Sequence, residues 1–203
     1  STISDYDKEE VKRQFSISTS LVPLEYNGEN GPIKINLLDT PGYFDFVGEV
    51  EEAVSAADAA IIVVNCKAGI EVGTEKAWDL CEEYKLPRII FVTNMDDDHA
   101  SFRELILKLE KQFGRKIAPF QVPIRENEKF VGFVNAVKME GRRFTNLSDY
   151  EECEIPEYTK KNLGIIRDAL IEAVAETSEE YMERYFSGEE FTQDEIYTAV
   201  QTN

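Results

Sequence analysis

The sequence feature that most constrains the fold is an apolar run that ends in Asp39-Thr40-Pro41-Gly42. Residues 33–38 are rich in β-branched and leucine side chains, and the proline and glycine stop the run abruptly, which predicts a buried strand. Asp39 then stands at the carboxyl end of the strand, where open α/β sheets bind ligands. A carboxylate there can hold Mg²⁺, and the N–H of Gly42 is open to a phosphate oxygen. The same residues also suit a simple turn, with Asp39 as its cap and Gly42 supplying its bend.

Strands and helices alternate along the first half of the chain. Further strands are expected at residues 15–22, 59–64 and 87–92, and helices at residues 47–57, 74–84 and 102–113. The strand starts at Ile33, Ala59 and Arg88 recur about every 26–29 residues, as in βαβ units. This spacing predicts an α/β fold, in which helices cover parallel strands. The first of these strands pairs antiparallel with residues 33–38 through a turn, and the polar stretch 1–16 needs a partner to become ordered.

The pattern changes near residues 115–120. Short antiparallel strands are expected at residues 119–124, 130–137 and 142–144, followed by an acidic connection at 150–156. Helices are then expected at residues 160–177, 178–186 and 192–202. The second half of the chain is therefore predicted to be a small α+β module.

The composition excludes several classes of protein. The 203 residues include 40 acidic and 22 basic side chains, a formal charge of −18. This balance argues against direct sequence-specific binding of nucleic acid, whose phosphates are bound by Lys and Arg. No apolar run approaches the length that a membrane span needs. Three scattered cysteines without a Cys-x-x-Cys pair are typical of a reduced intracellular protein, so we expect a cytoplasmic location.

A second strand-end motif stands about fifty residues after the first. Asn94-Met95-Asp96-Asp97 follows the strand expected at residues 87–92. A carboxylate at such a place can accept the two N–H donors on the Watson–Crick edge of guanine. One loop suited to Mg²⁺ and phosphate, together with one suited to a base, predicts a nucleotide site at one edge of the sheet.

These motifs resemble those of the translational GTPases, specifically elongation factor G and the related ribosome-protection factors. The matching stretches are residues 13–17, 35–46, 49–51, 87–96 and 132–139, and residues 175–185 resemble part of the insert of elongation factor G. The resemblance implies a partial P-loop GTPase-type sheet with a small α+β insert subdomain. Residues 1–116 would form the partial GTPase domain and residues 117–203 the insert. The first strand and the phosphate loop would precede Ser1, and the loop that closes over guanine would follow Asn203.

The resemblance also implies roles for individual residues. Ser16 and Asp39 would bind Mg²⁺, and the N–H of Gly42 would sense the γ-phosphate of GTP. The nucleotide-binding residues implied by the two motifs are Asp39, Thr40, Pro41, Gly42, Thr93, Asn94 and Asp96.

The sequence departs from the family pattern at three places. Tyr43 stands where the family has a water-positioning histidine, and a phenol with a pKa near 10 is a poor proton acceptor at neutral pH. Tyr43 either orients a water or packs on the next helix. The base-reading motif of the family can be aligned without a gap, which makes Asp96 the residue that binds guanine. Shifted by one residue, the alignment makes it Asp97 instead. The matching residues on both sides of the motif favour the ungapped alignment. The 203 residues also contain no Gly-x-x-x-x-Gly-Lys-Ser/Thr, so we expect weak or no nucleotide binding.

Two functions remain open at this point. The first is that the longer protein binds and hydrolyses GTP on the ribosome during protein synthesis. The alternative is a hydrolysis-deficient, GTPase-like module that serves as a ribosome or partner adaptor, as Tyr43 and Thr93 suggest. The acidic helices after residue 156 either meet the ribosomal stalk protein, as the resemblance implies, or form a solvated surface. An uncovered sheet edge would favour a non-native dimer.

Overall fold

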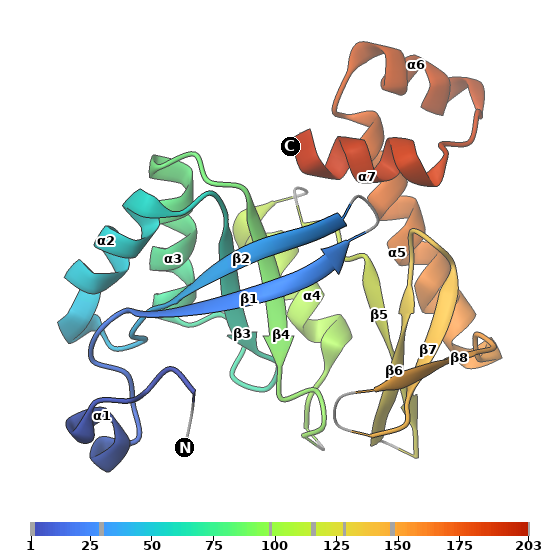
Figure 1. Cartoon of the computed structure of the whole chain (residues 1–203). Helices are drawn as coiled ribbons and strands as arrows, with labels where there is room; N and C mark the ends of the chain where they lie inside the picture. Colours follow the sequence, from blue (N-terminus) through green and yellow to red (C-terminus); the bar gives the residue numbers. More distant parts are fainter. Residues whose placement is uncertain are drawn as a thin grey trace. The chain divides into compact units, whose positions relative to one another are not determined.

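The computed structural model describes residues 3–28, 31–97, 99–114, 117–127, 129–146 and 149–202 (Figure 1). The chain divides into two compact units. Unit 1 comprises Ser1–Val63 and Glu71–Phe91, and unit 2 comprises Val64–Ile70 and Val92–Asn203. The division differs from the domain boundary expected at residues 116 and 117, of which residue 116 lies outside the described residues. The boundary stays a prediction about domains.

Unit 1 contains a two-stranded antiparallel sheet and three α-helices among its described residues. Its elements are α1 (Lys8–Arg13), β1 (Ser20–Gly28), β2 (Gly31–Asp39), the short 3₁₀ helix η1 (Phe44–Phe46), α2 (Val47–Ala56) and α3 (Val72–Glu83). β1 and β2 pair in antiparallel register, with Ser20 opposite Asp39. The antiparallel pairing was predicted correctly, but β1 begins at Ser20 and not at residue 15. The turn expected at residues 27–32 lies partly outside the described residues.

The prediction that residues 33–38 form a buried strand is wrong about burial. Ile33 is 51% exposed, Ile35 40% and Leu37 38%. The reason is that β2 is hydrogen-bonded to β1 alone among the described strands, so the two strands form a separate sheet. An apolar run predicts that a strand is suited to burial, but the covering layer has to come from elsewhere in the fold.

The strands β3 (Ala60–Asn65) and β4 (Arg88–Thr93) run parallel, as the βαβ spacing predicts. The Ala60 N–H donates to the Pro87 carbonyl at 2.9 Å, and the Cys66 N–H donates to the Thr93 carbonyl at 3.0 Å. Because both pairs advance together along the sequence, the two strands point the same way.

One face of this strand pair is covered and the other is not. Ile62 is only 5% exposed, whereas its neighbours Ile61 and Val63 are 58% and 60% exposed. On β4, Ile89 and Phe91 are likewise 53% and 58% exposed. The apolar runs therefore include side chains that the described residues leave open, and such patches favour contact with further protein.

Unit 2 is built around a four-stranded antiparallel sheet in the order β5-β6-β7-β8. Its elements are α4 (Phe102–Phe113), β5 (Gln121–Glu126), β6 (Lys129–Asn135), β7 (Glu140–Phe144), β8 (Tyr150–Cys153), α5 (Glu157–Ala175), α6 (Glu179–Ser187) and α7 (Gln193–Thr202). The predicted α+β pattern is confirmed. Residues 150–153, expected as a connection, are a strand. In the register of β7 and β8, Arg142 stands opposite Glu152 and Arg143 opposite Glu151. The ion pairs of the two arginines are formed with Glu140 and Glu126.

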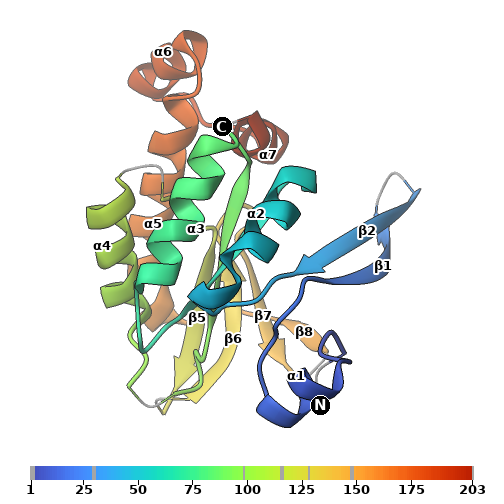
Figure 2. The same ribbon diagram turned by 90° about the vertical axis from the view of Figure 1, so that its left-hand side faces the viewer.

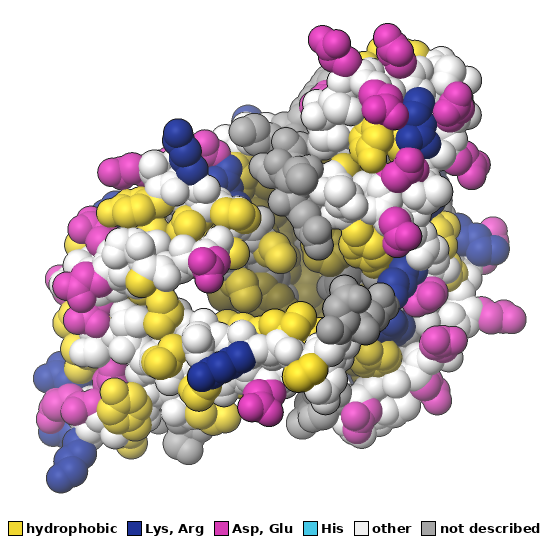
Figure 3. Space-filling model, turned by 45° about the horizontal axis from the view of Figure 1, so that its top comes forward, with side chains coloured by type: hydrophobic (Ala, Val, Ile, Leu, Met, Phe, Trp, Pro, Cys, Tyr) yellow, Lys and Arg dark blue, Asp and Glu magenta, His cyan; other side chains and the backbone are white. Residues whose placement is uncertain are grey.

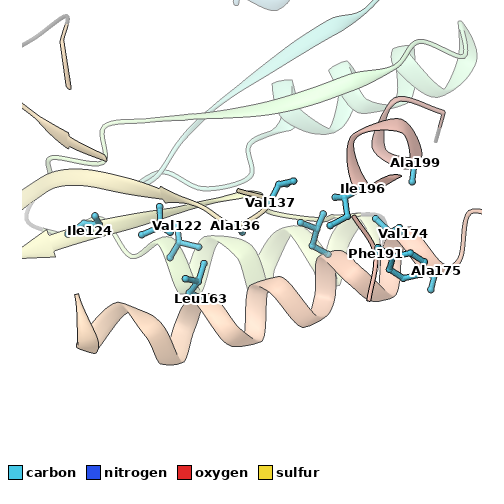
Figure 4. Packing of buried hydrophobic residues seen from close by; sticks show 12 residues of the cluster. Val122, Ile124, Ala136, Val137, Leu163, Val174, Ala175, Phe191, Ile196 and Ala199 are labelled. Carbon is cyan, nitrogen blue, oxygen red and sulfur yellow. The ribbon is translucent and has the colours of Figure 1, made fainter. Parts of the chain in front are cut away.

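The core of unit 2 lies between this sheet and α5. Leu163, Leu170 and Val174 of α5 are at most 2% exposed, and they belong to the same cluster as Val122 and Val134 of the sheet (Figure 4). Figure 2 shows α5 running alongside the strands of the sheet. Full burial of a Leu or Val side chain contributes about 1.5–3 kcal/mol, so this layer accounts for much of the stability of unit 2.

An ion pair holds the start of α7 to α6. The Glu195 carboxylate accepts a bond from Arg184 Nη1 at 2.6 Å and from the Thr192 N–H at 2.8 Å. The Arg184 bond first, and the Thr192 bonds second, lower the pKa of Glu195 from 4.5 to about 2. The carboxylate therefore stabilises the folded state only while it is ionised.

Acid is expected to remove this stabilisation. Because the folded-state pKa lies below the unfolded one, the contribution is complete above about pH 4.5 and disappears as the pH falls towards 2. Glu195→Gln should lower the melting temperature at pH 6 and should show a smaller further loss at pH 3 than the wild type. Thermal unfolding at both pH values measures this, with Asp194→Asn as the control. Equal acid sensitivity in Glu195→Gln and wild type would contradict the assignment.

Candidate functional site

The first strand-end loop presents an acid and an open glycine to solvent. Asp39 is the last residue of β2 and is exposed, while Pro41 is buried and anchors the loop. A Cβ added at Gly42 would meet nothing within 4 Å. The Gly42 N–H also donates to no described residue. The loop thus leaves space and an unused donor beside a carboxylate, which suits the approach of a phosphate oxygen.

The oxygen donors near this loop are of the kind that Mg²⁺ prefers. The Ser16 hydroxyl donates to Asp5 Oδ1 at 2.7 Å, and the described structure records no bond between Ser16 and Asp39. Within the described ranges, no three His, Cys, Asp or Glu side chains are grouped as a metal site. The donors fit Mg²⁺ chemically, and the metal role of Ser16 and Asp39 stays a prediction.

Tyr43 has a ring partner that the sequence did not suggest. It is 56% exposed, and its ring lies 4.7 Å from that of Phe15, centroid to centroid. Phe15 also approaches Phe46 of η1, with ring centroids 6.5 Å apart. The segment before β1 therefore contacts the segment after β2 through aromatic rings, while much of Tyr43 remains accessible to water.

Carboxylates hold the segment that carries Phe15 and Ser16. Glu10 is only 2% exposed, and its Oε1 accepts the N–H groups of Ile17 at 2.9 Å and Ser18 at 3.1 Å. Its Oε2 accepts the N–H of Asp7 at 3.2 Å. These backbone bonds, from Ile17 first, lower the pKa of Glu10. The chain itself supplies these bonds to the described part of residues 1–16, and the expectation that the stretch needs a partner to become ordered stays a prediction.

Glu49 of α2 holds the next residue of this segment. The Thr19 N–H donates to Glu49 Oε2 at 2.6 Å, and the Thr19 hydroxyl donates to the Glu49 carbonyl at 3.0 Å. Neither Glu10 nor Glu49 was predicted as a site residue. The pattern Asp7-x-x-Glu10, which forms a capping box at the start of α1, was the available signal for Glu10.

The second strand-end loop belongs to unit 2. Thr93 is the last residue of β4, and its hydroxyl lies 3.5 Å from the Val64 carbonyl. Asn94 has a positive φ of 55°, and its side-chain oxygen accepts a bond from Asn65 Nδ2 at 3.1 Å. The loop is therefore fixed at its first turn. Asp96, two residues on, is exposed.

The two candidate base-reading acids differ in their surroundings. Asp97 accepts bonds from the His99 N–H at 2.9 Å and from Lys67 Nζ at 3.2 Å. The His99 bond first, and the Lys67 bond second, lower the pKa of Asp97. Asp96 makes no bond to any described residue. Asp97 is thus engaged within the chain, whereas Asp96 is exposed and no described residue engages its carboxylate.

Comparison with known proteins assigns the family. Residues 1–193 match the model of the elongation factor Tu GTP binding domain. The chain belongs to this family. It is 36% identical over 197 residues to an elongation factor G-like protein of Thermotoga maritima, covering 97% of this chain and 28% of that protein. The resemblance to the translational GTPases, predicted from the motifs, is confirmed.

A solved structure supports the same assignment. A crystal structure of a protein from Thermus thermophilus matches with a TM-score of 0.88 and 34% identity, over 98% of this chain and 29% of that one. The predicted α/β GTPase-type fold is confirmed by this likeness. The chain spans less than a third of the length of both proteins. In the described part of the chain, no helix is long and apolar enough to cross a membrane.

Proposed function

We propose that this chain belongs to a longer protein that binds and hydrolyses GTP on the ribosome during protein synthesis. The observation that carries the proposal is the first strand-end loop, in which Asp39 is exposed and the N–H of Gly42, three residues later, donates to no described residue. Membership of the GTP-binding domain family supports it. Ribosome-stimulated phosphate release by the full-length protein tests the proposal, and a rate that ribosomes leave unchanged would contradict it.

Each residue of this loop has a role in the proposal. Asp39 and the Ser16 hydroxyl would hold Mg²⁺, whose charge favours binding of the triphosphate. Thr40 and Pro41 fix the backbone so that the Gly42 N–H donates to the γ-phosphate. Tyr43 orients the attacking water by a hydrogen bond from its hydroxyl. It does not take a proton from that water, because a phenol is a weak base at neutral pH.

The second loop reads the base. Asp96 accepts the two N–H donors of guanine, while Thr93 and Asn94 fix the loop through their bonds to Val64 and Asn65. The bonds of Asp97 to Lys67 and His99 support this register over the slid one.

The alternative function is that of a hydrolysis-deficient adaptor. It is favoured by Tyr43, which replaces a histidine and lies against Phe15 in this structure. The same phosphate-release assay separates the two functions. An adaptor would bind ribosomes without releasing phosphate, whereas an active GTPase would release phosphate faster when ribosomes are added.

The 203-residue chain itself is expected to bind GTP and GDP weakly or not at all. The backbone N–H groups and the lysine of a phosphate loop supply much of the nucleotide affinity in P-loop proteins, and this sequence has no such motif. Titration with a fluorescent GDP analogue in the presence of Mg²⁺ should show no saturation at micromolar concentrations. A dissociation constant in the micromolar range would contradict this prediction.

The acidic surface of the helical end of unit 2 suits the binding of a basic partner. The family resemblance suggests that this partner is the ribosomal stalk protein. Acidic side chains are frequent on this end of unit 2 (Figure 3). The exposed acids of α6 and the following loop are Glu179, Glu180, Glu183, Glu189 and Glu190. Phe186 among them is 79% exposed and offers an apolar contact. Salt-sensitive binding of the stalk protein to this chain tests the proposal, and absence of binding at low salt would contradict it.

The open apolar strands β3 and β4 support self-association of the isolated chain. Ile61, Val63, Ile89 and Phe91 are each more than half exposed, and exposed strands invite pairing between chains. We propose that the isolated chain forms a non-native dimer through these strands. For the longer protein we propose a cytoplasmic location. Sedimentation that shows only monomer at high concentration would contradict the dimer.

A further inference from the structure

We propose that Glu10 is a positioning residue, whose carboxylate fixes the segment Phe15–Thr19 and thereby holds the Phe15 ring against Tyr43. The positioning is a property of this chain alone. Its consequence for GTP hydrolysis rests on the function proposed above.

The burial of the Glu10 carboxylate has to be compensated by bonds within the chain. Ionised carboxylates are almost never fully buried unless they are paired, because desolvation of the charge is costly. Glu10 is 2% exposed, and three backbone N–H groups compensate it, those of Asp7, Ile17 and Ser18. The carboxylate thus joins α1 to a segment that follows it in sequence and lies outside any helix or strand.

A second carboxylate completes the arrangement. The consecutive N–H groups of Ile17, Ser18 and Thr19 all donate to carboxylates, the first two to Glu10 and the third to Glu49. These residues therefore have no need of a partner strand, and β1 starts only at Ser20. Because Glu49 lies on α2, the segment is tied at one end to α1 and at the other to the helix that follows Tyr43.

The consequence falls on Phe15. Its ring lies 4.7 Å from that of Tyr43, and it is separated from Ile17 by one residue. Loss of the Glu10 bonds would leave the Ile17 and Ser18 N–H groups without protein partners and would release the segment towards water. Tyr43 would then lose its contact with the Phe15 ring. Glu10 thus acts on Tyr43 through Phe15 and does not touch it directly.

Nuclear magnetic resonance and proteolysis of the 203-residue chain test the proposal. In Glu10→Ala, the ring proton signals of Tyr43 should lose the shift caused by the Phe15 ring and approach those of a solvated tyrosine. Chymotryptic cleavage after Phe15, identified by mass spectrometry, should become about tenfold faster or more, because charge-assisted bonds no longer oppose opening. Glu10→Gln keeps one acceptor oxygen without the charge and should give an intermediate result.

Two controls separate positioning from general destabilisation. Glu9→Gln removes the adjacent charge on α1, whose carboxylate bonds to Arg13 at an exposed surface, and should leave both readouts unchanged. The fluorescence of Trp78 on α3 reports whether unit 1 remains folded. Wild-type Tyr43 signals and a wild-type cleavage rate in Glu10→Ala would overturn the proposal. If Glu10→Ala unfolds unit 1, the test rests on Glu10→Gln. Tyr43 ring proton signals identical to those of the wild type in Glu10→Gln would then overturn the proposal. Neither readout depends on nucleotide, so failure of the proposed GTPase function would not affect them.

Discussion

Replacing Gly132 by alanine is expected to destabilise unit 2 by about 3 kcal/mol or more. Gly132 lies on β6, where it pairs with Arg143 of β7. A Cβ at this position would overlap the carbonyl oxygen of Arg142 and would lie 2.9 Å from the Cα of Arg143. Both obstacles are backbone atoms, which cannot rotate away. The methyl group can therefore be placed only by separating β6 from β7, in the middle of the four-stranded sheet.

The matched control is another glycine of the same unit. Gly164 lies within α5, where an added Cβ would meet nothing within 4 Å. Gly164→Ala should stabilise the helix by about 0.5–1 kcal/mol, because alanine loses less backbone entropy on folding. Urea unfolding followed by circular dichroism measures both variants. A Gly132→Ala protein within about 1 kcal/mol of the wild type would show that β6 and β7 are not held as closely as described.

Local signals predicted the helices well. The helix expected at residues 102–113 is α4, because an amphipathic period and the stop at Gly114 agree, and in the structure Ser101 caps its start. The positions of β3 and β4 followed from apolar runs bounded by turn residues. Burial was predicted less well: Ile33 of β2 and Ile61 of β3 lie in apolar runs and are exposed. An apolar run shows which side chains of a strand are suited to burial. Whether they are buried depends on a covering layer that comes from distant parts of the fold.

The candidate site shows the same difference between local and distant information. The placement of Asp39 at a strand end follows from the residues next to it. The contacts of Glu10 with Ile17 and of Phe15 with Tyr43 join residues that share no short motif, so no local pattern indicated them. The start of β1 was misplaced for this reason. Alternation of apolar and hydroxyl residues predicted a strand where carboxylates in fact take up the backbone N–H groups.

The sequence favoured Asp96 as the base-reading acid through its matching flanks, but the spacing from Asn94 also fitted Asp97. The two side chains become distinguishable only in three dimensions, where Asp97 is bonded to Lys67 and to the His99 N–H. Lys67 follows β3 and is thirty residues away from Asp97 along the chain. Sequence spacing alone could not have revealed that this lysine engages Asp97 and not Asp96.

Asp96→Asn in the full-length protein is therefore expected to reduce affinity for GDP by about 10²–10⁴-fold, because two charge-assisted bonds to guanine are lost. An amide presents one donor and one acceptor, so the variant should gain affinity for xanthosine diphosphate, whose base carries an oxygen in place of the guanine amino group. Competition between the two nucleotides for a fluorescent analogue measures the change in preference.

Asp97→Asn is the matched control, with the same chemical change one residue away. It removes an ion pair whose side chains are 55% and 30% exposed, and solvent screens such pairs so that they contribute little. Its nucleotide preference should therefore remain that of the wild type, with at most a several-fold loss of affinity. If Asp97→Asn instead changed the preference from guanine to xanthine nucleotides and Asp96→Asn did not, the alignment shifted by one residue to Asp97 would be correct. The bonds of Asp97 to Lys67 and His99 would then have to break when nucleotide binds.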